Sequence, residues 1–252
     1  MDQSSPLFKR YLGIDYSGAQ TPTSSLTGLR VYSATPTQPP IEIHPPPSRR
    51  KYWTRHGLAH WLAAELASEP ATLVGIDHAF SFPLRYFEKY SLPSHWPTDA
   101  QNITVDCLRH GRHGNGAQRT GNARWRRLAE ERCRAKSVFH FDVQGSVAKS
   151  THAGLPWLRF LRMLLGTQLH FWPFDGWNPP QGSPVVAEVY PALWNRHFPS
   201  EGRNSHQHDA YTVARWMREQ DANHQLINHF HPRLAPTERT LADTEGWILG
   251  LD

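Results

Sequence analysis

The sequence is poor in cysteine and has no long hydrophobic run. Two of the 252 residues are cysteine, Cys107 and Cys133, and they do not form the paired spacing of a metal site. Thiols without such spacing are typical of a reducing compartment, so we expect a cytoplasmic location. No apolar stretch approaches the roughly 20 residues that span a membrane, so no membrane partner is expected. The first residues, Met1 to Pro6, lack the basic-then-apolar order of a secretory signal.

Hydrophobic residues make up only 38% of the chain, but aromatic residues are plentiful. Ten Trp, eleven Phe and eight Tyr can fill the core of one large domain, which we expect to cover residues 1–252. Twenty-one Pro and seventeen Gly indicate long, irregular connections. Lysine and arginine number 27 against 22 acids, a formal charge of +5 that suits a polyanionic partner such as nucleic acid.

Two short segments share one pattern, an apolar run that ends in Gly-Ile-Asp. The first ends at Asp15 and the second at Asp77. Runs this short predict buried strands rather than helices, and two strands that end alike can set two carboxylates side by side. Close carboxylates repel each other unless a divalent cation neutralises them. Each Asp is alternatively the cap of a turn after its strand, but the repetition favours a functional pair.

The predicted elements follow the order three strands, a helix, a strand, a long insertion, a strand and a helix. The main strands are expected at residues 8–16, 26–33, 41–44, 71–77 and 185–190. The main helices are expected at 54–67, at 155–165 and from about 205 onward, and a further short strand at 168–172. The first three strands are spaced like an antiparallel meander. Strand, helix and strand then alternate, which indicates an α/β protein.

The insertion after the fourth strand, at about residues 84–140, carries an excess of basic residues. Between Arg109 and Lys136 there are nine Arg or Lys and two acids. We predict a glycine-rich loop followed by a basic helix over residues 123–135. A solvated helix face is the alternative, but the one-sided charge favours contact with a polyanion. The residues predicted to contact phosphate are Arg112, Arg119, Arg124, Arg126 and Arg127.

Four acids lie at the ends of core elements: Asp15, Asp77, Glu188 and Asp209. This arrangement resembles the ribonuclease H-like fold, a mixed five-stranded sheet in the order 3-2-1-4-5 flanked by helices. The motifs around the acids are similar to those of an uncharacterised bacterial family described as predicted RNase H-like nucleases. The similar segments are Gly13–Asp15, Gly75–Pro83, Glu188–Pro191 and His208–Ala210. His206, three residues before Asp209, resembles the His-x-x-Asp of RuvC-type resolvases.

The resemblance implies a metal-dependent nuclease that hydrolyses phosphodiester bonds of DNA or RNA. Two Mg²⁺ or Mn²⁺ ions would activate water and stabilise the leaving oxyanion. Asp15 is expected to bridge both ions, with Asp77 and Asp209 each completing one site. Glu188 would either face the metals or pair with an arginine, and His206 would help to activate the attacking water.

Two other classes of protein fit parts of the sequence. An actin-like ATPase or kinase also begins with a strand that ends in Asp and a small-residue hairpin, which binds phosphate. Such proteins usually need a duplicated domain and a second phosphate loop, for which 252 residues leave little room. A non-catalytic nucleic-acid-binding protein of the same fold accounts for the basic segment, but it has no need of four acids.

Overall fold

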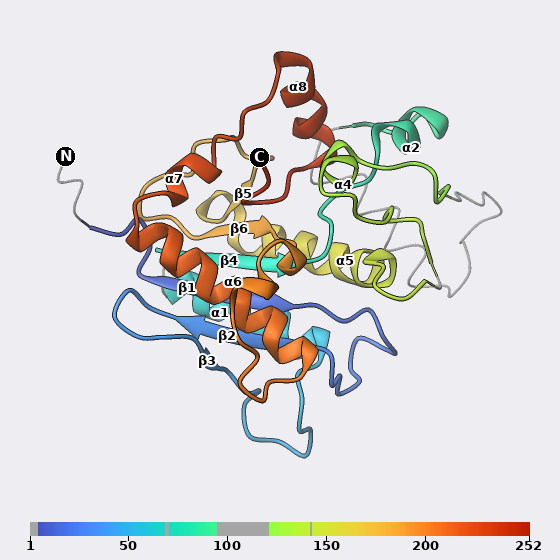
Figure 1. Cartoon of the computed structure of the whole chain (residues 1–252). Coiled ribbons are helices and arrows are strands. Elements are labelled where there is room, and N and C mark those ends of the chain that lie inside the picture. Colours follow the sequence, from blue (N-terminus) through green and yellow to red (C-terminus); the bar gives the residue numbers. More distant parts are fainter. Residues whose placement is uncertain (1–4, 69–70, 95–120, 142) are drawn as a thin grey trace.

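A mixed sheet of six strands, in the order β3-β2-β1-β4-β6-β5, forms the centre of the fold (Figure 1). The computed structural model describes residues 5–68, 71–94, 121–141 and 143–252. The strands are β1 Arg10–Asp15, β2 Arg30–Ala34, β3 Ile41–Glu42, β4 Thr72–Asp77, β5 His170–Trp172 and β6 Val185–Glu188. Strand β2 is antiparallel to both of its neighbours, β1 and β3, whereas β1, β4, β6 and β5 run parallel.

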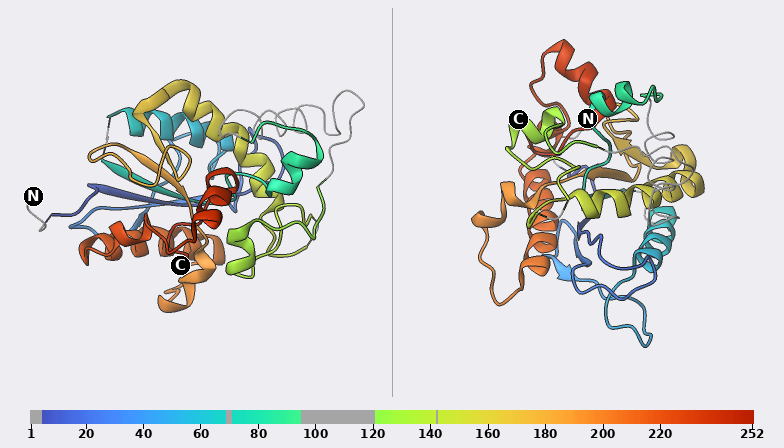
Figure 2. Two further views of the ribbon diagram at one scale, coloured as in Figure 1. Left: turned by 90° about the horizontal axis from the view of Figure 1, so that it is seen from above. Right: turned by 90° about the vertical axis from the view of Figure 1, so that its right-hand side faces the viewer.

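Helices cover both faces of the sheet and make three layers (Figure 2). On one face lie α1 Arg55–Ser68 and α5 Ala148–Leu165, and on the other lies α6 Ser205–Ala222. The shorter elements are α2 Leu84–Lys89, α4 Leu128–Arg132, α7 Leu226–His229, α8 Pro236–Glu245 and the 3-10 turns η2 Gly166–Gln168, η3 Pro191–Leu193 and η4 Asn195–His197. The prediction of an α/β protein with a mixed sheet and flanking helices is confirmed. None of the described helices has the length and apolar character needed to cross a membrane.

The number of strands and the extent of two helices differ from the prediction. The sheet has six strands rather than five, because β5 pairs in parallel with β6 at the edge. The basic helix expected over 123–135 is reduced to the five residues of α4. Helix α5 begins at residue 148 and continues through Pro156. Burial of Ala153, Leu155 and Leu158 on both sides of this proline outweighs the loss of one helical hydrogen bond.

Two glycines allow α6 to lie directly on the sheet. Gly13 of β1 and Gly75 of β4 are register partners, and both face α6. A Cβ atom at Gly13 would lie 2.2 Å from the carbonyl oxygen of Ala210, and one at Gly75 would lie 2.7 Å from a methyl group of Val213. No larger residue fits at Gly13 without moving the helix backbone. This close packing determines where the N-terminal turns of α6 stand relative to the strand ends.

Candidate catalytic site

The two Gly-Ile-Asp segments lie side by side at the carboxyl ends of β1 and β4. Asp15 is the register partner of Asp77, and the residues before them match one for one. Because the two strands are parallel, both carboxylates leave the sheet at the same edge. Side chains alternate along a strand, so Asp15 and Asp77 share the face of Gly13 and Gly75, which is the face covered by α6.

The first turns of α6 bring His206 and Asp209 to the same edge. The helix begins after Asn204, whose side chain accepts a hydrogen bond from the backbone of Gln207 at 3.0 Å. The Nδ1 atom of His206 lies 2.7 Å from Oδ2 of Asp15, and the side chain of His206 is 53% exposed. The other ring nitrogen of His206 has no hydrogen-bond partner among the residues that the structure describes. A carboxylate thus orients an imidazole whose second nitrogen is available to a substrate or to water.

Asp209 lies near a residue that sequence reasoning missed, Asn195. The amide of Asn195 makes a weak hydrogen bond of 3.4 Å to Oδ1 of Asp209, and its carbonyl oxygen lies 2.8 Å from Nε2 of His208. Asn195 belongs to a single 3-10 turn after β6, and a segment this short has no periodic pattern. No signal in the sequence could have associated Asn195 with Asp209.

The acids at this edge raise the pKa values of one another. Burial raises the pKa of Asp77 well above its usual range, and the charges of Asp15, Asp209 and Glu188 raise it further. Among the described residues the Asp77 carboxylate has no hydrogen-bond or ion-pair partner. Burial also raises the pKa of Asp15, although the hydrogen bond from His206 opposes this, and burial raises the pKa of Asp209. The pKa of His206 is raised by its hydrogen bond to Asp15. Ionised carboxylates are therefore disfavoured together at this edge unless a cation is bound beside them.

Glu188 pairs with an arginine, and its assignment as a metal ligand is corrected. Arg127 donates to both of its carboxylate oxygens, at 2.6 and 2.8 Å, and the backbone of Phe80 donates to Oε2 at 3.1 Å. Both oxygens are therefore occupied. The prediction that Arg127 contacts phosphate is also wrong, because its side chain is only 1% exposed and is bound to Glu188 and Glu130. Its buried charge requires these partners.

The same network holds the segment around Arg127 against the edge of the sheet that carries Asp15 and Asp77. Arg127 also donates to the backbone carbonyl of Glu245, at the end of α8. The carboxylate of Glu245 accepts hydrogen bonds from the backbone of Leu84, at 2.6 Å, and of Leu128, at 2.7 Å. One residue near the end of the chain therefore binds the start of α2 and the start of α4 together.

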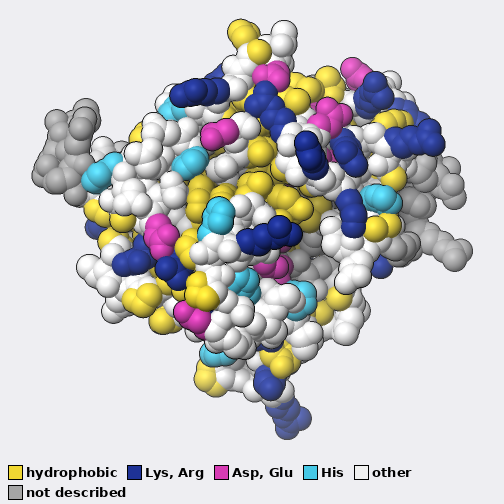
Figure 3. Space-filling view, in the orientation of Figure 1, with side chains coloured by type: hydrophobic (Ala, Val, Ile, Leu, Met, Phe, Trp, Pro, Cys, Tyr) yellow, Lys and Arg dark blue, Asp and Glu magenta, His cyan; other side chains and the backbone are white. Residues whose placement is uncertain are grey.

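The remaining predicted phosphate contacts are exposed where the structure describes them. Arg124 and Arg126 are exposed, whereas Arg112 and Arg119 lie outside the described residues. Figure 3 shows basic side chains over the region of α4 and α8, above a hollow near the middle of this face in which acidic surface is visible. Basic side chains in such a position can bind the backbone of a polyanion, and the acidic hollow beside them would then lie close to one point of that backbone.

The carboxylate oxygens at the strand ends are ligands of the type that a hard divalent cation prefers. They are not arranged as a complete coordination sphere. Within the described ranges, no group of three or more His, Cys, Asp or Glu side chains is arranged to hold a metal ion. Asp15 points to His206, and Asp209 makes its weak bond to Asn195. The carboxylate of Asp77, together with the free oxygens of Asp15 and Asp209, offers the oxygen ligands that Mg²⁺ and Mn²⁺ prefer.

Comparisons of the chain with protein-family models, with curated proteins and with solved structures find no significant match. The function therefore has to be argued from the geometry and charge of the site.

Proposed function

We propose that the chain is a Mg²⁺- or Mn²⁺-dependent nuclease that hydrolyses phosphodiester bonds of DNA or RNA in a ribonuclease H-like fold. The observation that carries the proposal is the in-register placement of Asp15 and Asp77 at the ends of parallel strands. Asp209 is close enough to raise the pKa of Asp77 further. Carboxylates held together with no cationic partner for Asp77 destabilise a protein unless they bind a cation.

Asp15, Asp77 and Asp209 would hold the metal ions, with Asp15 shared between them. Bound Mg²⁺ or Mn²⁺ would supply Lewis acidity toward the phosphate and lower the pKa of the attacking water. Asp15 also orients His206 through the 2.7 Å hydrogen bond, so the free nitrogen of this half-exposed ring can accept a proton from water. Glu188 takes a positioning role, because it binds the backbone of Phe80 just beyond β4.

The exposed Arg124 and Arg126 would contact the phosphate backbone of the nucleic acid. Their neighbour Arg127 binds this segment to Glu188 at the end of β6, so the two exposed arginines are held close to the acidic edge. Phosphate contacts of this kind orient a nucleic acid without reading its sequence.

A non-catalytic nucleic-acid-binding protein is the second candidate. The observation that favours it is that the carboxylates of Asp15 and Asp209 are directed to His206 and Asn195 rather than to a shared centre. In such a protein the basic segment would bind nucleic acid and the acids would bind no metal.

The test compares wild type with Asp15→Asn, and with Asp243→Asn as a matched control on the exposed surface of α8. Labelled single-stranded, duplex, hybrid and branched substrates are incubated with Mg²⁺, Mn²⁺ or chelator, and Mn²⁺ binding is measured by calorimetry. We expect Asp15→Asn to lose cleavage by several orders of magnitude and to lose Mn²⁺ binding, because the metals supply nucleophile and charge stabilisation together. The control should behave as wild type.

Cleavage that survives chelator or the Asp15→Asn substitution would show that the two-metal proposal is wrong. Wild type that binds nucleic acid but neither binds Mn²⁺ nor cleaves any substrate would establish the second candidate instead.

A further inference from the structure

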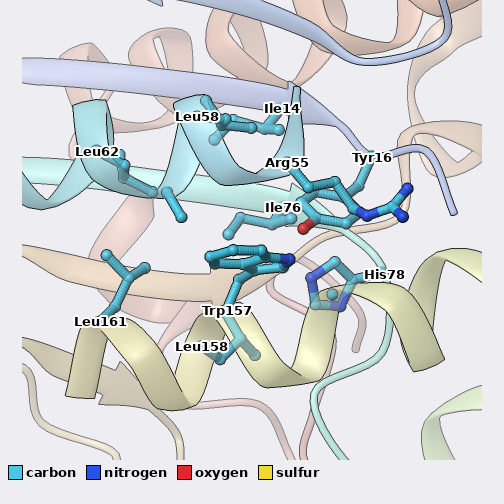
Figure 4. A pocket seen from close by; sticks show the side chains of 12 residues that line it. Ile14, Tyr16, Arg55, Leu58, Leu62, Ile76, His78, Trp157, Leu158 and Leu161 are labelled. Carbon is cyan, nitrogen blue, oxygen red and sulfur yellow. The ribbon is translucent and has the colours of Figure 1, made fainter. Parts of the chain in front are cut away.

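The hydrogen bond between His206 and Asp15 joins two elements that are held in different ways. Asp15 ends β1, and the next residue packs on the opposite face of the sheet. There the ring of Tyr16 contacts the ring of His78, with centroids 4.7 Å apart, in a mainly apolar layer between the sheet, α1 and α5 (Figure 4). His206 instead lies in the first turn of α6, and its side chain is 53% exposed. One hydrogen bond does not fix the direction of such a ring, so its direction depends on what else holds the helix turn and the ring.

Glu42 of β3 holds the first turn of α6 to the edge of the sheet. Its Oε2 atom accepts a hydrogen bond of 2.8 Å from Nε2 of Gln207. The oxygen of the same Gln207 amide accepts from the backbone of Asn204 at 3.2 Å, so this side chain links the cap of the helix to the sheet. Gln207 directly follows His206 in the chain. The bond to Glu42 therefore fixes the helix turn that carries His206.

Arg30 of β2 fixes Glu42 in turn. It donates to Oε1 of Glu42 at 2.9 Å, and its Nε atom donates to the carbonyl of Thr27 at 2.8 Å. The side chains of Arg30 and Glu42 are 9% and 15% exposed, so solvent screens this ion pair less than an exposed one. Arg30 is also the register partner of Asp15 on the neighbouring strand. One guanidinium thus binds both Glu42 and the turn that precedes β2.

The turn before β2 contacts the His206 ring itself, at Gly28. A Cβ atom at Gly28 would lie 3.2 Å from Cε1 and 3.3 Å from Nε2 of His206, so the ring lies directly against the glycine. Gly28 follows Thr27, whose carbonyl binds Arg30. The contacts therefore form a closed circuit. Arg30 holds Glu42, which holds the helix turn, and it also holds the turn that borders the ring.

We propose that Glu42 is a positioning residue for His206. Through Gln207 it fixes the first turn of α6, while Gly28 and the carboxylate of Asp15 limit the rotation of the ring, so that the free ring nitrogen keeps one direction. The inference rests on the proposed function, in which that nitrogen accepts a proton from water.

The position requires a carboxylate rather than an amide. Glu42 accepts from Arg30 with one oxygen and from Gln207 with the other. An amide has a single acceptor atom, so Glu42→Gln would set its NH₂ group against one of these two donors. Gln207 could turn its own amide round only by losing the hydrogen bond from Asn204. The substitution therefore releases the helix turn with almost no change in side-chain size.

The experiment compares the full chain as wild type, Glu42→Gln and Glu65→Gln, each with and without His206→Ala. Glu65→Gln is the matched control, because Glu65 also pairs with a strand arginine, Arg10, but does so from α1 on the other face of the sheet. The cleavage assay with Mn²⁺ measures kcat and KM. We expect kcat to fall about tenfold in Glu42→Gln with little change in KM, as is typical when a group that orients a site residue is lost. In the His206→Ala background the same substitution should have no further effect, because the group that it positions is absent.

Equal kcat values for Glu42→Gln and Glu65→Gln would overturn the proposal, and so would a loss that persists in the His206→Ala background. Crystal structures of the metal-free proteins give a second readout that needs no activity. The distance from Nδ1 of His206 to Oδ2 of Asp15 is 2.7 Å, and we expect it to exceed hydrogen-bonding distance in Glu42→Gln alone. An unchanged His206 ring in that variant would overturn the positioning role. If wild type cleaves no substrate, the proposed function fails, and the crystal structures still decide whether Glu42 positions His206.

Discussion

Replacing Gly13 by alanine should separate α6 from the strand ends and so test the geometry of the whole site. The new Cβ atom would lie 2.2 Å from the carbonyl oxygen of Ala210, against the 3.4 Å at which ordinary contact begins, so the helix has to retreat by about 1.2 Å. A side-chain rotation cannot relieve this clash, because it lies between a Cβ atom of β1 and a backbone oxygen of α6. His206 and Asp209, one turn or less from Ala210, would move with the helix.

The expected loss in Gly13→Ala is large for both stability and function. Overpacking that moves backbone costs about 3 kcal/mol or more, which corresponds to a fall in Tm of roughly 6–12 °C for a chain of this size. A displacement of about 1 Å in a catalytic group costs on the order of a hundredfold in rate. Thermal unfolding, Mn²⁺ calorimetry and the cleavage assay measure the three effects.

Gly57→Ala is the matched control for this prediction. Gly57 lies in the first turn of α1 on the opposite face of the sheet, and a Cβ atom there would lie 3.0 Å from the hydroxyl of Thr54, which accepts a hydrogen bond from the backbone of Gly57. The Thr54 hydroxyl has to move by a few tenths of an ångström, and the better helix propensity of alanine, about 1 kcal/mol, offsets that cost, so the Tm of the control should change little. An unchanged Tm in Gly13→Ala would refute the described packing of α6 on β1. Lost stability with unchanged Mn²⁺ affinity would refute the role of α6 in the site.

Three further predictions concern the substitution of charged residues. Arg127→Met should lower the free energy of unfolding in urea by about 3–5 kcal/mol, because it leaves buried carboxylates unpaired, and adding Glu188→Gln should restore part of that loss. Without metal, Asp77→Asn should be more stable than wild type at neutral pH. Its folded pKa is raised, so Asp77 costs stability as pH rises above about 4, and thermal unfolding should show the two proteins converging toward pH 4. Neutralising both Arg124 and Arg126 should reduce the log–log salt slope of nucleic-acid binding by roughly 1.8, and an unchanged slope would exclude them as phosphate contacts.

The sequence identified the elements whose pattern is local. The runs before Asp15 and Asp77 are short and apolar and end in Gly-Ile-Asp, and they form β1 and β4 within one or two residues of the predicted limits. The apolar stripe after residue 205 predicted α6, and Asn204 caps it. In each case the information lies within one stretch of chain.

The errors arose where distant residues decide the structure. Arg127 has the same sequence surroundings as the exposed Arg126, yet it is buried because Glu188 lies 61 residues further along the chain. That ion pair also removes Glu188 from the candidate ligands. Charge pattern alone predicted a long basic helix, but only the five residues of α4 are helical, and Arg127 directly before them is buried. The contact of His206 with Asp15 spans 191 residues and has no local signal either.

The position of Glu245 has a consequence for how this chain can change over evolution. Its two carboxylate oxygens join residues 84 and 128, so everything between those positions begins and ends at one fixed point. A loop that starts and ends at one fixed point can change in length at little entropic cost, because doubling the length of such a loop costs only about 0.6 kcal/mol. Tyr86, Phe87 and Arg127 lie between the anchors and are buried, so they have to be kept together with the anchors and Glu245. A library that varies exposed positions between the anchors, such as Arg124 and Arg126, is the natural starting point for altering what reaches the acidic edge.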